Sequence, residues 1–355
     1  MSELPLEGVR VLDLSRLLPG PFATLQLADL GAEVIKVESP TRPDYLRFLE
    51  PYVEDQNVAF RLVNRGKKSV IINFETEAGA ALVRRLAATC QVVIESFRAG
   101  FLGRFGLDYA GLADPGLIYC SLTAYGQFSA RAAHDLNSLA VTGLADLLAG
   151  PEGPVVPKVQ LADITGGLTA ANAILAALVA RARTGKGRYL DVSMADAAYH
   201  LTLLSSESAR HGVDSFHGGA LDGRARFYRY YCCADGKWLA VGAMEDKFRQ
   251  LLVEALGSDD PGPVLASRER AHWVEVLGPL DACVEPVLSA EEVLESQWFR
   301  QRFSADHLPG LLEASYPGRG GAACPPGVHT AEQLLALGVS QAEFERLVAE
   351  GVVAG

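Results

Sequence analysis

Apolar positions in the first 125 residues follow two alternating patterns. Short, almost continuous apolar runs predict buried strands at 9–14, 33–38, 69–74, 91–95 and 117–122. Runs with a helical period lie between them, at 22–30 and 77–89. Apolar strands separated by helices are typical of a parallel sheet that is covered on both faces. The sequence therefore predicts an α/β fold with a Rossmann-like large domain.

The pattern changes in the second half of the chain. A stretch rich in alanine and glycine, 164–182, predicts a closely packed helix that ends at Gly185. Aromatic residues then recur from 226 to 233, and the turn signal Asp235-Gly236 precedes another apolar run, which indicates a hairpin. Further helical periods follow at 248–256, 291–301 and, in two pieces, 330–353.

These patterns predict two domains. The chain has 355 residues, of which 49% are hydrophobic and 21% charged, so it is long enough for two cores. Residues 211–223 are rich in glycine, aspartate and serine, which indicates a change of unit. We predict, in chain order, a large domain at 1–195, a linker at 196–222, a small α+β domain at 223–315, and a return linker with C-terminal helices that complete the large domain at 316–355.

Charge and composition exclude several classes of partner. The net charge of -11 and a pI near 5.2, without a Lys/Arg run longer than two, disfavour nucleic acid. We expect no membrane partner, because residues 1–5 lack a basic region followed by an apolar one and no uncharged apolar stretch reaches about 18 residues. The sequence thus predicts a cytoplasmic protein.

Metal and nucleotide cofactors are also disfavoured. The six cysteines are scattered without a CxxC pair, so we expect reduced packing residues rather than a metal site or a disulfide framework. The first turn between strand and helix carries Pro19-Gly20-Pro21 where a dinucleotide fold would have GxGxxG. Because a pyrophosphate cannot approach such a turn closely, we expect no NAD.

Candidate chemistry centres on the segment His134-Asp135 and on Asp163. An imidazole and a carboxylate on opposite sides of one carbon can remove a proton from one face and return it to the other, which is racemase or epimerase chemistry. Structural interpretations remain open, since a histidine before a helix is often a cap, and Asp163 can cap the helix that follows it.

The chain resembles the family III CoA-transferases of the CaiB/BaiF type. The segments that carry this resemblance are 6–14, 18–21, 27–38, 64–69 and 184–187. Within that family, His134-Asp135-Leu136-Asn137, Asp163 and the segment 240–245 are similar to the α-methylacyl-CoA racemase branch. The resemblance implies an interlocked homodimer, in which the large domain of one subunit and the small domain of the other form the active site.

The resemblance also implies roles for four residues. His134 and Asp163 would be the opposing acid and base, and Glu245 of the partner subunit would orient His134. Asp135 would share a proton with Asp163, because two close carboxylates do not both ionise readily. Enolate formation also needs oxyanion stabilisation, which we place at the free backbone N–H groups of the helix that begins near Asp163.

A CoA thioester requires basic side chains and backbone amides along its path. By family resemblance we predict CoA contacts from Ile71, Ile72, Asn73, Phe74, Phe97, Arg98, Arg104, Ala133, Leu136, Asn137 and Ser138. Many relatives have an arginine where this chain has Ser39, so a phosphate contact is either lost or transferred to Lys36, Arg42, Lys67 or Lys68. No cofactor beyond the CoA moiety of the substrate is expected.

Three functions stay open at this point. The leading one is a racemase of 2-methylacyl-CoA thioesters. The second is a CoA-transferase in which Asp163 attacks the thioester and forms an acyl-enzyme anhydride. The third is a CoA-binding protein without activity, which the intact His134, Asp163 and Glu245 argue against. A short segment at 257–273 and only three methionines suggest an acyl group smaller or more polar than a branched fatty acid.

Overall fold

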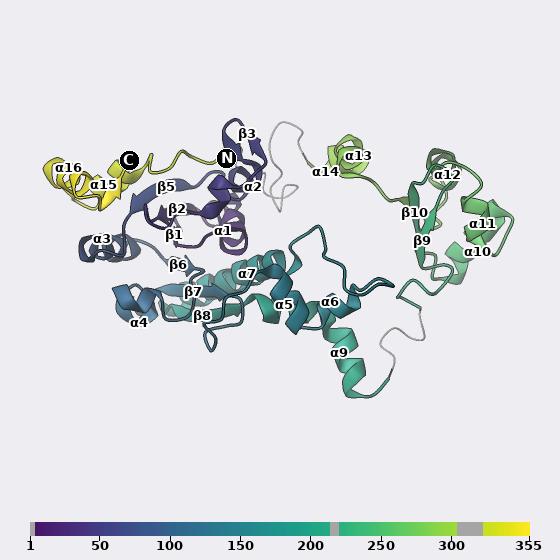
Figure 1. Ribbon diagram of the computed structural model, residues 1–355, viewed down its shortest axis with the longest axis horizontal. Helices are drawn as coiled ribbons and strands as arrows, with labels where there is room; N and C mark the ends of the chain where they lie inside the picture. The colour runs from purple at the N-terminus through teal and green to yellow at the C-terminus, as the bar shows by residue number, and fades with distance from the viewer. Residues whose placement is uncertain (1–3, 214–219, 304–321) are drawn as a thin grey trace. The chain divides into compact units, whose positions relative to one another are not determined.

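The computed structural model describes residues 4–213, 220–303 and 322–355. The chain forms two compact units (Figure 1). The larger unit comprises Met1–Thr202 and Arg302–Gly355, and the smaller one comprises Leu203–Gln301. The larger unit is therefore built from two separate stretches of the chain.

A seven-stranded sheet forms the centre of the larger unit, in the order β12-β5-β2-β1-β6-β7-β8 (Figure 1). All neighbours pair in parallel except β12, which is antiparallel to β5. The strands are β1 (Arg10–Asp13), β2 (Glu33–Glu38), β5 (Lys68–Ile72), β6 (Val92–Glu95), β7 (Ile118–Thr123), β8 (Arg188–Ser193) and β12 (Val353–Ala354). This confirms the predicted α/β fold with a parallel sheet.

Helices cover both faces of this sheet because its central strands are apolar on both sides. One core contains side chains of α1 (Pro19–Asp29), α7 (Leu161–Thr184) and α8 (Met194–Tyr199). The other contains side chains of α3 (Glu77–Ala87), α15 (Thr330–Ala336) and α16 (Gln341–Ala349). The C-terminal helices thus complete the fold that the first strands begin.

Small residues bring α7 close to α1. A Cβ atom added at Gly167 would lie 2.7 Å from the Pro19 carbonyl oxygen and 2.9 Å from the Phe22 ring. The absence of a side chain at Gly167 therefore fixes the start of α1 against the first turns of α7. Both of these helix ends contribute residues to the site described below.

Helix α7 is the one helix in the described ranges that is long and apolar enough to cross a membrane. Length and composition alone support that assignment. Its residues Ala162, Ala170, Ala171 and Ile174 are at most 1% exposed and belong to the core beside the sheet. The burial of these side chains is typical of a core helix, so α7 is weak evidence for a membrane segment, and the cytoplasmic location stays a prediction.

The predicted linker at 196–222 contains regular structure. Helix α8, the 3₁₀ helix η3 (His200–Thr202) and α9 (Leu203–Arg210) occupy residues 194–210. Ala197 and Ala198 are at most 2% exposed, which explains why α8 packs onto the larger unit, whereas α9 belongs to the smaller one. The polar composition used to predict the linker begins only at His211, and residues 214–219 and 304–321 lie outside the described ranges.

The smaller unit has a three-stranded antiparallel sheet in the order β11-β10-β9. The predicted hairpin is present as β9 (Arg229–Cys232) and β10 (Trp238–Val241), and β11 (Val284–Pro286) pairs with β10. Besides α9, its helices are α10 (Asp246–Leu256), α11 (Pro261–Leu265), α12 (Arg270–Leu277), α13 (Ala290–Glu295) and α14 (Gln297–Arg302). The single helix predicted at 291–301 is wrong, because Ser296 has an extended backbone (ψ 151°) that separates α13 from α14.

Shorter elements complete the described chain. They are η1 (Tyr45–Phe48), β3 (Tyr52–Val53), β4 (Gln56–Asn57), α2 (Val58–Val63), η2 (Leu102–Phe105), α4 (Tyr109–Leu112), α5 (Asp135–Val141) and α6 (Leu144–Leu147). Of these, η1 contributes Tyr45 to the site described below, and α5 begins directly after the site residue His134. Each lies beyond the carboxyl end of a strand of the large sheet, η1 after β2 and α5 after β7.

Candidate active site

A cavity of about 540 Å³ lies at the carboxyl ends of the large sheet. Its lining comes from the segments that follow β1, β2, β6, β7 and β8, together with the end of β7 and the first turn of α7. Ligands of parallel α/β sheets bind in this position, because the loops at the carboxyl edge converge there. Five of the predicted site residues line this one cavity, namely Phe97, Arg98, Ala133, His134 and Asp163.

Asp163 is in the first turn of α7 and only partly exposed. Burial, reinforced by the nearby carboxylate of Asp135, raises the pKa of Asp163 to about 7. Protonated and ionised forms are therefore both abundant near neutral pH. A carboxyl group in this state can both donate and accept a proton, as a general acid or base must.

Asp135 holds the start of α7. Its Oδ1 accepts hydrogen bonds from the backbone N–H groups of Ala162 (2.7 Å) and Asp163 (3.0 Å). The expectation that these N–H groups are free to bind an oxyanion is therefore wrong, because a carboxylate already occupies them. The proton sharing between Asp135 and Asp163 stays a prediction, and the contacts of Asp135 support a positioning role.

His134 is the exposed residue immediately before α5. Its backbone N–H donates to Asn137 Oδ1 at 3.0 Å, which closes the first turn of the helix. Two residues of the segment 134–137 therefore have structural roles. Asn137 accepts from the backbone of His134, and Asp135 accepts from the first N–H groups of α7. The position of His134 on the cavity lining makes its ring available to a ligand.

Four arginines line the cavity: Arg16, Arg42, Arg98 and Arg131. Three of them lie over aromatic rings, with 5.0 Å from Arg16 to the Phe97 ring, 5.1 Å from Arg42 to Phe101 and 5.3 Å from Arg131 to Tyr125. Stacking preserves the charge and the donors of a guanidinium group, although Arg42 already donates its Nε to the Glu75 carboxylate and has only its remaining N–H groups for a phosphate. The cavity is therefore suited to an anionic ligand.

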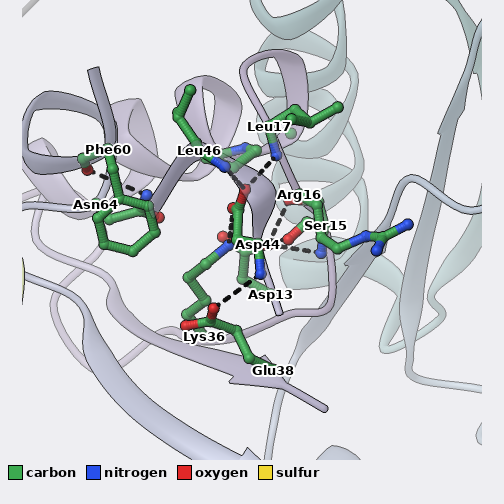
Figure 2. Close-up of polar contacts among 12 residues, drawn as sticks. Asp13, Ser15, Arg16, Leu17, Lys36, Glu38, Asp44, Leu46, Phe60 and Asn64 are labelled. Atoms are coloured by element: carbon green, nitrogen blue, oxygen red, sulfur yellow. Dashed lines mark hydrogen bonds and ion pairs between the residues drawn. The ribbon is translucent and has the colours of Figure 1, made fainter. Parts of the chain in front are cut away.

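A buried group of charged side chains holds the loop that carries Arg16 (Figure 2). Lys36 Nζ donates to the Ser15 carbonyl oxygen at 2.9 Å and forms an ion pair with Asp44 at 3.0 Å, and both side chains are at most 2% exposed. Asp44 Oδ1 accepts from the Leu17 N–H at 3.0 Å. This contact stabilises Leu17 in a left-handed conformation (φ 64°). The pair thereby sets the path of the backbone on both sides of Arg16.

Two of the four side chains considered as replacements for the missing arginine at Ser39 are structural. Lys36 is buried as described above, and burial opposes its charge, but Asp44 and Asp13 nevertheless raise its pKa. Lys67 is 3% exposed and contacts Asp13 at 3.1 Å and the Pro21 carbonyl oxygen at 2.9 Å. Lys68 forms ion pairs with Glu332 and Glu33. Of the four, Arg42 is the one that lines the cavity.

Other predicted CoA contacts lie outside the cavity lining. Ile72 and Phe74 are at most 1% exposed and belong to the core, so their side chains are not accessible to a ligand. Asn73 accepts hydrogen bonds from Ser39 and the Glu75 N–H. The remaining positions outside the lining are Ile71, Arg104, Leu136, Asn137 and Ser138, and their contribution to CoA binding stays a prediction.

Glu245 belongs to the smaller unit. It is exposed and immediately precedes α10, where its carbonyl oxygen accepts from the N–H groups of Phe248 (3.1 Å) and Arg249 (3.0 Å). These are ordinary contacts of a residue at the start of a helix, and they leave its carboxylate accessible. Its role toward His134 stays a prediction.

Sequence reasoning missed three of the cavity arginines as site residues. Arg16, Arg42 and Arg131 line the cavity although none was assigned to the site, and Arg42 was considered only as a replacement at Ser39. A signal for two of them was present, since Arg16 and Arg42 each follow a predicted strand by a few residues. Arg131 lies in a loop without a recognisable pattern, so nothing in the sequence indicates it.

Comparison with known proteins agrees with this architecture. The sequence model of CoA-transferase family III matches residues 6–264, which is well over half of the chain. The chain belongs to CoA-transferase family III. Proteins with different activities, racemases and CoA-transferases, are among its relatives.

The alpha-methylacyl-CoA racemase of Homo sapiens is 33% identical to the chain, over 99% of this chain and 98% of its own length. The acetyl-CoA:oxalate CoA-transferase of Acetobacter aceti is 41% identical, over 81% of this chain and 82% of its own length. The crystal structure of a CAIB/BAIF family protein from Brucella suis has a TM-score of 0.81 at 29% identity and covers 95% of this chain and 100% of that one. The family III fold is confirmed, and the chain is an enzyme of this racemase and transferase superfamily.

Proposed function

We propose that this protein is a racemase of 2-methylacyl-CoA thioesters. The observation that carries the proposal is the shared cavity of His134 and Asp163, in which the pKa of Asp163 is near 7. A two-base racemisation needs two groups that each exist in both protonation states at the working pH. The similarity to the human racemase along nearly the whole chain supports the same reaction.

The proposed reaction transfers one proton at each face of the substrate. The imidazole of His134 removes the α-proton of one enantiomer, and the electron pair of the C–H bond moves into a planar enolate. The protonated carboxyl of Asp163 then donates its proton to the opposite face, which inverts the centre. In the reverse direction ionised Asp163 is the base and protonated His134 is the acid, so no other reactant is consumed.

The cavity arginines are proposed to bind the phosphates of CoA. Arg42 is the best candidate to replace the arginine that many relatives have at Ser39, because it lines the cavity and lies over the Phe101 ring. Arg16, Arg98 and Arg131 add donors around the same volume. We also propose an interlocked homodimer in which Glu245 of the partner subunit orients His134, as the family resemblance implies.

The alternative is a CoA-transferase in which Asp163 is the nucleophile. The 41% identity to an acetyl-CoA:oxalate CoA-transferase supports this alternative. A nucleophilic carboxylate must be ionised, however, and a pKa of about 7 keeps a large fraction of Asp163 protonated at neutral pH. The raised pKa therefore fits an acid and base better than a nucleophile.

Proton exchange in deuterated water distinguishes the two functions. A single enantiomer of a 2-methylacyl-CoA is incubated with the protein without an acyl acceptor. Racemisation predicts deuterium at the α-carbon and loss of optical purity, which mass spectrometry and chiral chromatography measure. Transfer of CoA to an added carboxylate, without exchange at the α-carbon, would show that the protein is a transferase.

The raised pKa of Asp163 predicts a pH-dependent stability difference. The native state binds this proton more tightly than the unfolded chain, whose pKa is near 3.8. Stability contributed by Asp163 is therefore lost as the pH rises from about 4 to 7. Asp163→Asn removes this effect, so the variant should be about 2–4 kcal/mol more stable than the wild type at pH 8 and nearly equal to it at pH 4.

Urea denaturation of both proteins across this pH range measures the difference. Asp196→Asn is the matched control, because Asp196 is also in the first turn of a helix but is exposed. An Asp163→Asn variant that is less stable than the wild type at pH 8 would contradict the prediction.

A further inference from the structure

Thr123 lines the cavity, and its hydroxyl forms no hydrogen bond within the described ranges. It is the last residue of β7, is 7% exposed, and lines the same cavity as His134 and Asp163. Its Oγ1 is buried and has no hydrogen-bond partner within the described ranges. Most buried hydroxyl groups have such a partner, and one that lacks it lowers stability. A ligand in the cavity could supply the missing partner.

The proposed reaction requires a donor to the thioester oxygen. Charge collects on the thioester oxygen when the α-proton leaves, and a fixed donor must stabilise it. The backbone N–H groups of Ala162 and Asp163 are occupied by Asp135. Within the described ranges the Thr123 hydroxyl has no acceptor to give up, so its O–H can rotate about the Cβ–Oγ1 bond toward a substrate oxygen without losing a hydrogen bond.

We propose that the Thr123 hydroxyl donates a hydrogen bond to the thioester oxygen of the acyl-CoA and stabilises the enolate. The inference rests on the proposed function insofar as an acyl-CoA occupies this cavity. It does not depend on the choice between racemase and transferase, because both reactions develop negative charge on the thioester oxygen. Threonine stays protonated throughout, so the proton count of the reaction is unchanged.

A pair of binding probes tests the contact without requiring turnover. Isobutyryl-CoA has the thioester oxygen, whereas the thioether S-isobutyl-CoA lacks it. Thr123→Val keeps the shape of the side chain and removes the hydroxyl, so it should weaken isobutyryl-CoA about tenfold and leave S-isobutyl-CoA unchanged in calorimetry. Equal affinity changes for both probes, or no change for either, would overturn the inference.

Kinetics provide the second measurement. Thr123→Val should lower kcat about 100-fold and raise KM about tenfold, in line with the weaker binding of isobutyryl-CoA, and Thr123→Ser should restore most of the rate. Thr169→Val is the matched control, since Thr169 donates to the Thr165 carbonyl oxygen in α7 and does not line the cavity. If Thr123→Ser is as slow as Thr123→Val, the hydroxyl is not the donor.

The two proposals can fail separately. If the wild type neither exchanges the α-proton nor transfers CoA, the proposed function is refuted. The Thr123 contact still stands in that case if Thr123→Val weakens isobutyryl-CoA but not S-isobutyl-CoA. If the wild type racemises the substrate, the proposed function stands. The Thr123 contact is refuted in that case if Thr123→Val racemises equally fast and binds both probes with the affinity of the wild type.

Discussion

His134→Ala is expected to abolish racemisation while leaving proton exchange from one enantiomer. Loss of a general acid or base lowers rates by about 10²–10⁴-fold, so overall racemisation should fall by at least about 1,000-fold. The enantiomer whose α-proton faces Asp163 can still lose that proton and regain a deuteron from the same side. Deuterium then appears in that enantiomer without inversion, whereas the other enantiomer stays unlabelled.

Asp163→Asn is the mirror-image variant and should give the opposite pattern. Each enantiomer is incubated separately in deuterated water with each variant, and label and optical purity are measured together. His211→Ala is the control, because His211 is an exposed histidine that pairs with Glu207 and does not line the cavity. Equal residual exchange from both enantiomers in either variant would contradict the two-base assignment.

The same two variants separate racemase from transferase. In a transferase that uses Asp163 as the nucleophile, Asp163→Asn abolishes CoA transfer and His134→Ala retains most of it. A racemase instead loses its inversion with either substitution. The pair therefore tests the role of His134, the residue on which the racemase proposal depends.

The sequence predicts the centre of the fold better than its edges. Strands β1, β2, β5, β6 and β7 are recognisable because burial on both faces requires continuous apolar runs. The edge strand β8 mixes exposed and buried residues, and β12 has two residues. Neither has a pattern that distinguishes a strand from a loop, and their place is decided by pairing with distant segments.

The site was predictable to a similar degree. His134 and Asp163 follow from the sequence motifs, and the cavity brings them together. The contact of Asp135 with the N–H groups of α7 joins residues 27 and 28 positions apart, and no local pattern indicates it. The hydroxyl of Thr123 is noticeable only because it has no hydrogen-bond partner in the part of the chain that the structure describes. Such features depend on three-dimensional neighbours and not on spacing along the chain.

Asp44→Ala is expected to be the most destabilising single substitution near the cavity. It leaves the Lys36 ammonium buried with the Ser15 carbonyl oxygen but without its carboxylate partner. Removal of one member of a buried ion pair lowers the free energy of unfolding by about 3–5 kcal/mol. It also removes the acceptor of the Leu17 N–H, so the loop that carries Arg16 loses its support.

Urea denaturation and CoA binding measure these two effects. Asp246→Ala serves as the control for an exposed ion pair, since its partner Arg249 is on the surface, and it should change stability by less than about 1 kcal/mol. The double variant Lys36→Met/Asp44→Leu removes both charges and should recover most of the lost stability, because apolar side chains can replace a buried ion pair. Leu17 still lacks its acceptor in this double variant, so CoA should remain weakly bound. Recovered stability with weak CoA binding would show that the Lys36–Asp44 pair positions the Arg16 loop and does not act on stability alone. If stability and CoA affinity recover together, Asp44 does not position that loop.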